Sequence, residues 1–174
     1  YAIRKNFGFL FQGAALFDSM NVEENVGLGL RENKRYTDQK ISEIVADKLE
    51  LVGLPGIQNQ SPADLSGGMK KRVSLARAIA DDPKYILYDE PTTGLDPVMS
   101  DNIDELILDL AKKLKVTSII VTHDIFSVIE IADRVVMMEG GVVYFSGTPK
   151  ELFESEDIVI TEFLKRTNKQ LNKT

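Results

Sequence analysis

Residues 85–97 read YILYDEPTTGLDP, an apolar run with an acidic end. Four bulky residues, Tyr85 to Tyr88, lead into two adjacent carboxylates, Asp89 and Glu90, and then into a loop punctuated by proline and glycine. The apolar run is typical of a buried strand. Ligands in parallel α/β sheets bind beyond the carboxyl ends of the strands, so polar residues at such an end indicate a site. The stretch therefore predicts an α/β fold with a ligand site at a strand tip.

Two further apolar runs predict strands, Thr117–Thr122 (TSIIVT) and Arg134–Met138 (RVVMM). Each of the three runs follows a stretch with helical spacing, which indicates buried parallel strands joined by crossover helices. Val98–Leu114, between the first run and the second, carries one apolar stripe at helical spacing. We therefore expect a parallel sheet with helices packed on it.

The segment from Gly13 to Ala63 shows no strand pattern. Its first part, GAALFDSMNVEENV, has the character of a loop, and Asp38–Val52 has the spacing of an amphipathic helix. We expect a helical insert in the α/β sheet here. Further on, Gly140–Gly141 predict a turn into a short hairpin, and Thr148 and Pro149 predict the start of another helix.

Composition excludes several classes of protein. The chain has 174 residues and is 43% hydrophobic, enough for one domain, or one domain with a subdomain, that buries a substantial core. Its apolar runs are all shorter than the roughly 18 residues that span a bilayer, so we expect any membrane role to depend on a partner. Cysteine is absent, which excludes disulfides and thiolate metal sites. The net charge of -6 argues against a nucleic-acid binder with a broad basic surface.

A second polar strand end carries His123, the single histidine, directly after TSIIVT. Because the carboxyl ends of parallel strands share one edge of a sheet, His123 could meet Asp89 and Glu90 there. In that interpretation Asp89 binds Mg²⁺, Glu90 is the general base for a water, and His123 contacts a terminal phosphate. The alternative is a strand-end turn with solvated carboxylates and a half-buried histidine. These residue types alone favour that alternative.

Residues 65–80, LSGGMKKRVSLARAIA, form a second candidate site. Ser66, Gly67 and Gly68 open a predicted helix, and the backbone N–H groups at a helix N-terminus suit a phosphate. The alternative is an ordinary serine cap with glycines in the turn. We expect the cations of this helix to form a solvated face and contacts at the core rim: Lys70, Lys71, Arg72 and Arg77.

The order and spacing of these motifs carry a family resemblance. Gln12 follows the apolar FGFLF, Ser66 comes 54 residues later, Asp89 lies 23 beyond Ser66, and His123 lies 34 beyond Asp89. In this order the chain resembles the nucleotide-binding subunit of ABC transporters over nearly its whole length. The matching motifs are the Q-loop (Gln12), the LSGGQ signature with Met for Gln (Leu65–Met69), the Walker B strand (Ile86–Glu90), the D-loop (Gly94–Asp96) and the switch histidine (His123).

The resemblance implies a fold, ligands and residue roles. The fold is a partial P-loop NTPase (RecA-like) core with a mostly parallel sheet, residues 1–12 and 85–174, and an ABC-type helical subdomain, residues 13–84. The ligands are ATP and Mg²⁺, hydrolysis taking place between two subunits that face head to tail. Catalytic roles fall on Glu90, His123 and Gln12, and metal binding on Asp89 and Gln12. Nucleotide binding falls on Ser66, Gly67, Gly68 and Asp96.

The family's phosphate-binding loop, G-x-x-x-x-G-K-S/T, should lie upstream of Gln12. No such motif occurs in these 174 residues. The polar residues at the strand ends cannot replace a loop of backbone N–H groups and a lysine wrapped around the β- and γ-phosphates. We therefore expect the parent protein to be an ATPase and the 174-residue chain by itself to be inactive.

Within the family, FLFQGAALFDSMNVEENVGLGLRE is similar to the ATPases of Mce/Mla-type lipid transporters. Their Q-loop is followed by GALFDSMTVxENV, which Ala14–Val26 nearly reproduces. This resemblance implies lipid or other hydrophobic cargo and a transmembrane permease docked in a groove between the Q-loop and the helical subdomain. The implied location is cytoplasmic, on the inner face of the cell membrane.

Three alternatives stay open. The first is another ABC importer, for example for amino acids. The second is a non-transport ABC ATPase of DNA repair or translation. The interval of 54 residues between Gln12 and Ser66 leaves no room for long coiled coils, and the acidic balance disfavours nucleic acid. The third is a catalytically silent module that supplies only a signature surface.

Overall fold

Three parallel strands form the sheet that carries the candidate site. The computed structural model describes residues 4–171, with side chains described for residues 5–166. Two compact units divide at Val121 and Thr122. The first unit contains β1 (Phe7–Leu10), α1 (Val22–Glu32), α2 (Asp38–Leu51), α3 (Gly67–Ala78), β2 (Tyr85–Asp89), α4 (Pro97–Leu114) and β3 (Thr117–Val121), with short 3₁₀ turns at Arg4–Asn6 and Pro62–Asp64.

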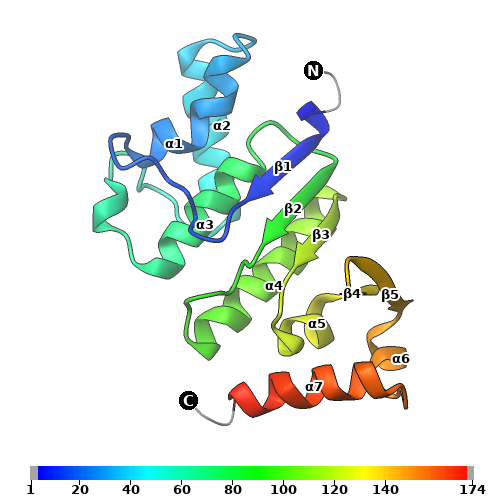
Figure 1. Cartoon of the computed structure of the whole chain (residues 1–174). Helices are drawn as coiled ribbons and strands as arrows, with labels where there is room; N and C mark the ends of the chain where they lie inside the picture. Colours follow the sequence, from blue (N-terminus) through cyan, green and yellow to red (C-terminus); the bar gives the residue numbers. More distant parts are fainter. Residues whose placement is uncertain (1–3, 172–174) are drawn as a thin grey trace. The chain divides into compact units, whose positions relative to one another are not determined.

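The sheet has the order β1-β2-β3 and is parallel throughout (Figure 1). Leu10 pairs with Tyr88, and Asp89 pairs with Val121, so the carboxyl ends of the strands lie at one edge. Ile86 and Tyr88 of β2 are buried, and α4 runs behind the sheet in the view of Figure 1. The predicted α/β architecture and the strands at β2 and β3 are therefore confirmed.

The opposite face of the three-stranded sheet is apolar and largely exposed. Phe9, Ile119 and Val121 are 48%, 48% and 60% exposed. β3 was expected to be a buried strand, and this is wrong. It is an edge strand of the sheet, like β1, and within residues 4–171 it pairs with β2 alone.

Close packing between β1 and α3 depends on Gly8. A β-carbon at Gly8 would lie 2.2 Å from the carbonyl oxygen of Ala78, near the end of α3. Backbone cannot give way as a flexible side chain can, so only glycine allows this approach. The helix that begins at Gly67 is thereby fixed against the strand that leads to Gln12.

The helical insert is confirmed, with a correction at its start. α1, α2 and α3 pack together beside β1 (Figure 1). The stretch from 13 to 26 was expected to be a loop, but α1 begins within it, at Val22. Asn21 and Glu24 form a capping box in which each side chain accepts a hydrogen bond from the other residue's backbone N–H. These bonds satisfy two N–H groups that a helix start otherwise leaves unpaired.

The second unit contains α5 (Ile125–Ile131), β4 (Val135–Glu139), β5 (Val142–Gly147), α6 (Pro149–Phe153) and α7 (Ile158–Leu171). β4 was expected to be a parallel strand, but it pairs antiparallel with β5 in a two-stranded sheet. Gly140 and Gly141, both with positive φ, turn the chain back at once, so the hairpin prediction is confirmed. The predicted start of α6 is also confirmed, with Thr148 as cap and Pro149 in the first turn.

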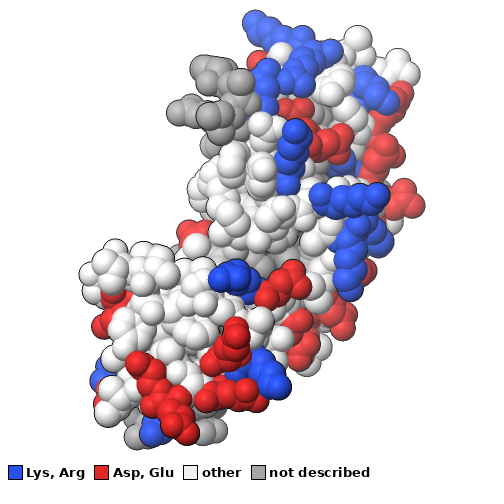
Figure 2. Space-filling view, turned by 90° about the vertical axis from the view of Figure 1, so that its right-hand side faces the viewer, with Lys and Arg blue, Asp and Glu red and all other residues white. Residues whose placement is uncertain are grey.

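None of the helices in the described range is both long enough and apolar enough to cross a membrane. On the face drawn in Figure 2, basic and acidic side chains are intermingled. The proposed division into a core, residues 1–12 and 85–174, and a helical subdomain, residues 13–84, stays a prediction. Of these, residues 1–3 and 172–174 lie outside the described range.

Candidate functional site

The carboxyl ends of β1 and β2 place three of the predicted site residues at one edge of the sheet. Gln12 lies two residues after the end of β1. Asp89 is the last residue of β2, and Glu90 follows it directly. Asp89 and Gln12 are exposed, whereas Glu90 is half-buried. The parallel register of β1 and β2 therefore brings together residues that lie more than 70 positions apart in the chain.

Glu90 is held in a left-handed backbone conformation with φ 48°. A non-glycine residue adopts this region rarely, and usually where surrounding contacts enforce it. Its N–H donates to the carbonyl oxygen of Val121 at 2.9 Å, and the Thr93 hydroxyl donates to Glu90 Oε2 at 2.9 Å. The carboxylate that follows the strand is thus fixed by both its backbone and its side chain.

Lys71 of α3 connects the ends of the two strands. Its ammonium donates to the carbonyl oxygen of Gln12 and, at 3.1 Å, to that of Glu90. The residue is 5% exposed. Burial lowers the pKa of Lys71, and the nearby carboxylates of Glu90 and Asp89 oppose that shift. For the cations of this helix we expected a solvated face and contacts at the core rim, and Lys71 is buried and does not lie on a solvated face.

Two more residues of α3 hold the loop after Gln12. Ala14 and Ala15 have φ values of 61° and 47°. Ser74 Oγ donates to the Ala14 carbonyl at 2.8 Å, and Arg77 donates to the carbonyls of Ala14 and Ala15 at 2.9 and 2.7 Å. Burial lowers the pKa of Arg77. The strained turn after Gln12 is therefore stabilised by side chains from the helix that starts at Gly67.

Ser66 caps α3, as the alternative interpretation of this residue predicts. Its Oγ accepts a hydrogen bond from the Met69 N–H at 3.2 Å. Ser66 and Gly67 are exposed, while Gly68 is buried against α4. The cap leaves the positive end of the helix dipole facing outward at Ser66 and Gly67.

Asp96 is the N-cap of α4 and lies near the start of α3. Its Oδ1 accepts a hydrogen bond from the Met99 N–H at 3.0 Å. A β-carbon at Gly67 would lie 3.7 Å from Leu95, and one at Gly68 would lie 2.8 Å from Met99. The structure therefore brings the segment that resembles the signature motif (Leu65–Met69) next to the segment that resembles the D-loop (Gly94–Asp96).

His123 belongs to the second unit. It is exposed, comes two residues after β3 ends, and directly precedes Asp124, the N-cap of α5. The prediction that it joins Asp89 and Glu90 in one site stays a prediction.

The donor groups at the sheet edge fit a magnesium ion that is shared with a phosphate. Among residues 4–171 no group of three or more His, Cys, Asp or Glu is arranged to hold a metal. Mg²⁺ is usually bound through one or two carboxylates, with waters and substrate phosphates completing its shell. The exposed carboxylate of Asp89, with the amide of Gln12 at the neighbouring strand end, matches that requirement.

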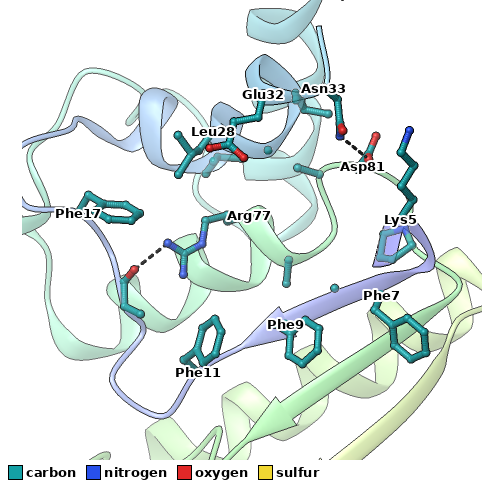
Figure 3. Close-up of a pocket in the computed structure, with 18 residues that line it drawn as sticks. Lys5, Phe7, Phe9, Phe11, Phe17, Leu28, Glu32, Asn33, Arg77 and Asp81 are labelled. Atoms are coloured by element: carbon teal, nitrogen blue, oxygen red, sulfur yellow. Dashed lines mark hydrogen bonds between the residues drawn. The ribbon is translucent and has the colours of Figure 1, made fainter. Parts of the chain in front are cut away.

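A groove of about 580 Å³ lies between β1, α1 and the end of α3. Figure 3 shows Phe17, Leu28 and Arg77 on one part of its wall and Phe9 and Phe11 on another. Lys5, Glu32 and Asp81 add charges to its lining. The loop that carries Phe17 is tied to α1, because Asn25 exchanges hydrogen bonds with the Phe17 backbone at 2.8 and 3.1 Å.

The parallel sheet, its polar carboxyl edge and the packed helical insert define an α/β domain of the P-loop NTPase class. The chain belongs to the ABC transporter family, whose model matches residues 1–93. The predicted fold class and family are therefore confirmed.

Relatives and a solved structure share this assignment. The chain is 43% identical over 165 residues to "Intermembrane phospholipid transport system ATP-binding protein MlaF" of Haemophilus influenzae, covering 95% of this chain and 62% of that protein. It is 41% identical over 164 residues to "Probable ribonucleotide transport ATP-binding protein mkl" of Mycobacterium leprae, covering 94% and 47%. A dimeric ATP-binding cassette bound to ADP and Pi is similar with a TM-score of 0.72 and 31% identity, covering 84% and 65%. The chain thus spans about half to three-fifths of the length of these two relatives.

Proposed function

We propose that the protein carrying this chain is the ATP-hydrolysing subunit of an ABC transporter that moves phospholipid or another hydrophobic cargo. The observation that carries the proposal is the meeting of Gln12, Asp89 and Glu90 at one edge of the parallel sheet. Membership of the ABC transporter family supports it, as does the identity of 43% to a phospholipid-transport ATP-binding protein.

In the proposed reaction, water attacks the γ-phosphorus of ATP. The half-buried Glu90 accepts the proton of that water as general base, and the bond between the γ-phosphorus and the oxygen of ADP breaks. Gln12 orients the water, and His123 contacts the γ-phosphate. Asp89 and Gln12 would hold Mg²⁺, which supplies charge neutralisation of the phosphate oxygens.

The proposed active assembly is a head-to-tail dimer of ATPase subunits. Ser66, Gly67, Gly68 and Asp96 would face the nucleotide held by the partner. The outward-facing start of α3, next to the Asp96 loop, supports this role, because a helix N-terminus offers N–H groups to a phosphate. The dimeric state of the similar cassette with ADP and Pi also supports it.

The groove beside Phe17 is the proposed docking site for a transmembrane permease. Its apolar wall suits an apolar helix side, and its charges could fix the orientation of that helix. Through this contact the ATPase would lie on the cytoplasmic, inner face of the cell membrane.

A second cargo has its own support. The mycobacterial relative at 41% identity is named for ribonucleotide transport. Reconstitution of the full-length protein with its permease in lipid-free detergent micelles, with ATP hydrolysis measured against added phospholipid and against added ribonucleotide, separates the two. Stimulation by phospholipid alone is expected. Stimulation by ribonucleotide alone would reject the lipid cargo, and absence of ATP hydrolysis with every cargo would reject the ATPase itself.

A further inference from the structure

Lys71 is a buried cation with two main-chain acceptors from separate segments of the chain. It lies on α3 and contacts the Gln12 carbonyl, 59 residues away in sequence, and the Glu90 carbonyl, 19 residues away. At 5% exposure, a lysine that lost these acceptors would keep a desolvated charge. Moving either carbonyl away from Lys71 would therefore cost free energy.

Both acceptors belong to backbone that needs support. Glu90 itself has φ 48°, and the turn after Gln12 contains Ala14 and Ala15 at positive φ. An ammonium group offers three N–H donors around one atom, so it can bind two carbonyls that approach from different directions. A neutral apolar side chain of similar length would leave both carbonyls without this donor.

The same helix begins at the outward-facing residues Ser66 and Gly67. Movement of α3 would reach Gln12 and Glu90 through one side chain, Lys71. Ser74 and Arg77 would transmit the same movement to the turn after Gln12.

We propose that Lys71 is a positioning residue. It holds the backbone at Gln12 and the backbone at Glu90 together, so the geometry of both depends on the position of α3. This inference rests on the proposed ATPase function. In an assembled dimer, nucleotide contact at the start of α3 of one subunit would then adjust the reacting groups of that same subunit.

The test compares Lys71→Met, Lys71→Arg and Lys48→Met in the full-length protein. Lys48 is the matched control, because it is also buried, at 8% exposure, and bonded, to Asp82 at 2.5 Å. Lys71→Met should lower kcat about tenfold or more while the KM for ATP stays within about threefold, since misplaced reacting groups affect the chemical step most. Lys71→Arg should recover at least half of the lost rate, because it restores a charged donor.

Three outcomes would overturn the proposal. The first is a wild-type kcat in folded Lys71→Met. The second is an equal loss of kcat in Lys48→Met, which would indicate general destabilisation. The third is an absence of recovery in Lys71→Arg together with a large rise in KM.

Hydrogen exchange separates failure of this proposal from failure of the ATPase function. Exchange at the Ala14 and Glu90 amides, which donate to Phe11 and Val121, should be faster in Lys71→Met than in wild type and in Lys48→Met. If wild type hydrolyses no ATP but both amides exchange faster in Lys71→Met, the ATPase function is rejected and the positioning role of Lys71 is supported. Unchanged exchange at both amides in Lys71→Met would reject the positioning role of Lys71.

Discussion

Gly68 of α3 lies directly against Met99 of α4. A β-carbon on Gly68 would lie 2.8 Å from Met99 Cε, closer than real β-carbons approach another atom. Gly68 is buried, and Met99 donates its N–H to the Asp96 cap. A β-carbon at this position would therefore displace the Met99 methyl group, which is the far end of a flexible side chain.

Gly68→Ala should lower the melting temperature through this contact. Overpacking in a well-packed site typically costs about 1–3 kcal/mol, and we expect about 1 kcal/mol because Met99 is flexible. In a Met99→Ala background the same change should cost much less, because the clashing atom is gone. Thermal unfolding of both single variants and the double variant measures this coupling. Equal costs in the two backgrounds would contradict it.

Tyr88 should make the fold sensitive to alkaline pH. The side chain is 1% exposed, and burial raises its pKa from 10.0 to about 12. The raised pKa means that the fold favours the neutral phenol. Its contribution is fully present below pH 10 and is lost as the pH rises from 10 to 12, by about 2–3 kcal/mol. Urea unfolding across this range measures the loss. Tyr88→Phe, which has no phenol to ionise, should lose less stability over the same range. An equal loss of stability in wild type and Tyr88→Phe would contradict the assignment of this pH dependence to Tyr88.

β2, β3 and the carboxylates that end β2 could be predicted because β-strand patterns are local, whereas β1 was not predicted as a strand. YILYD carries both the buried strand and the carboxylates that end it, and the parallel pairing follows from the helices between the strands. Gly140 and Gly141 indicated the hairpin of β4 and β5 in the sequence, but the parallel pairing expected for β4 was wrong, because this tight turn pairs it antiparallel with β5. The start of α1 was missed because Asn21 and Glu24 have loop-like neighbours.

The role of Lys71 was missed for a different reason. Its acceptors are main-chain carbonyls, which any residue type supplies, so neither Gln12 nor Glu90 signals the contact in the sequence. One signal was available. Lys71 lies three residues after Gly68 and four before Leu75, and all three are buried on α3. A lysine on an inward-facing stripe indicates a specific acceptor, because a buried charge needs one.

Phe17 should contribute to permease binding if the groove is the docking site. Its side chain is 50% exposed and lines the groove, and Met20 follows in the same loop. Phe17→Ala combined with Met20→Ala should reduce co-purification of the permease while ATP binding by the ATPase stays unchanged. Tyr36→Ala is the control, since Tyr36 is 40% exposed and is not one of the residues described around the groove. Wild-type recovery of the permease with the double variant would reject the docking site.

The central claim is that Glu90 acts as general base for ATP hydrolysis. Its half-buried carboxylate at the end of β2, fixed by Thr93, motivates the claim. Glu90→Gln keeps the size of the side chain and its acceptor for Thr93 but removes the base, so ATP should still bind.

Steady-state ATP hydrolysis by the full-length protein, with nucleotide binding measured on the same samples, tests this claim most directly. The account predicts that Glu90→Gln lowers kcat by about 10²–10⁴ with ATP affinity retained. A Glu90→Gln variant that hydrolyses ATP at a rate near that of wild type would contradict it.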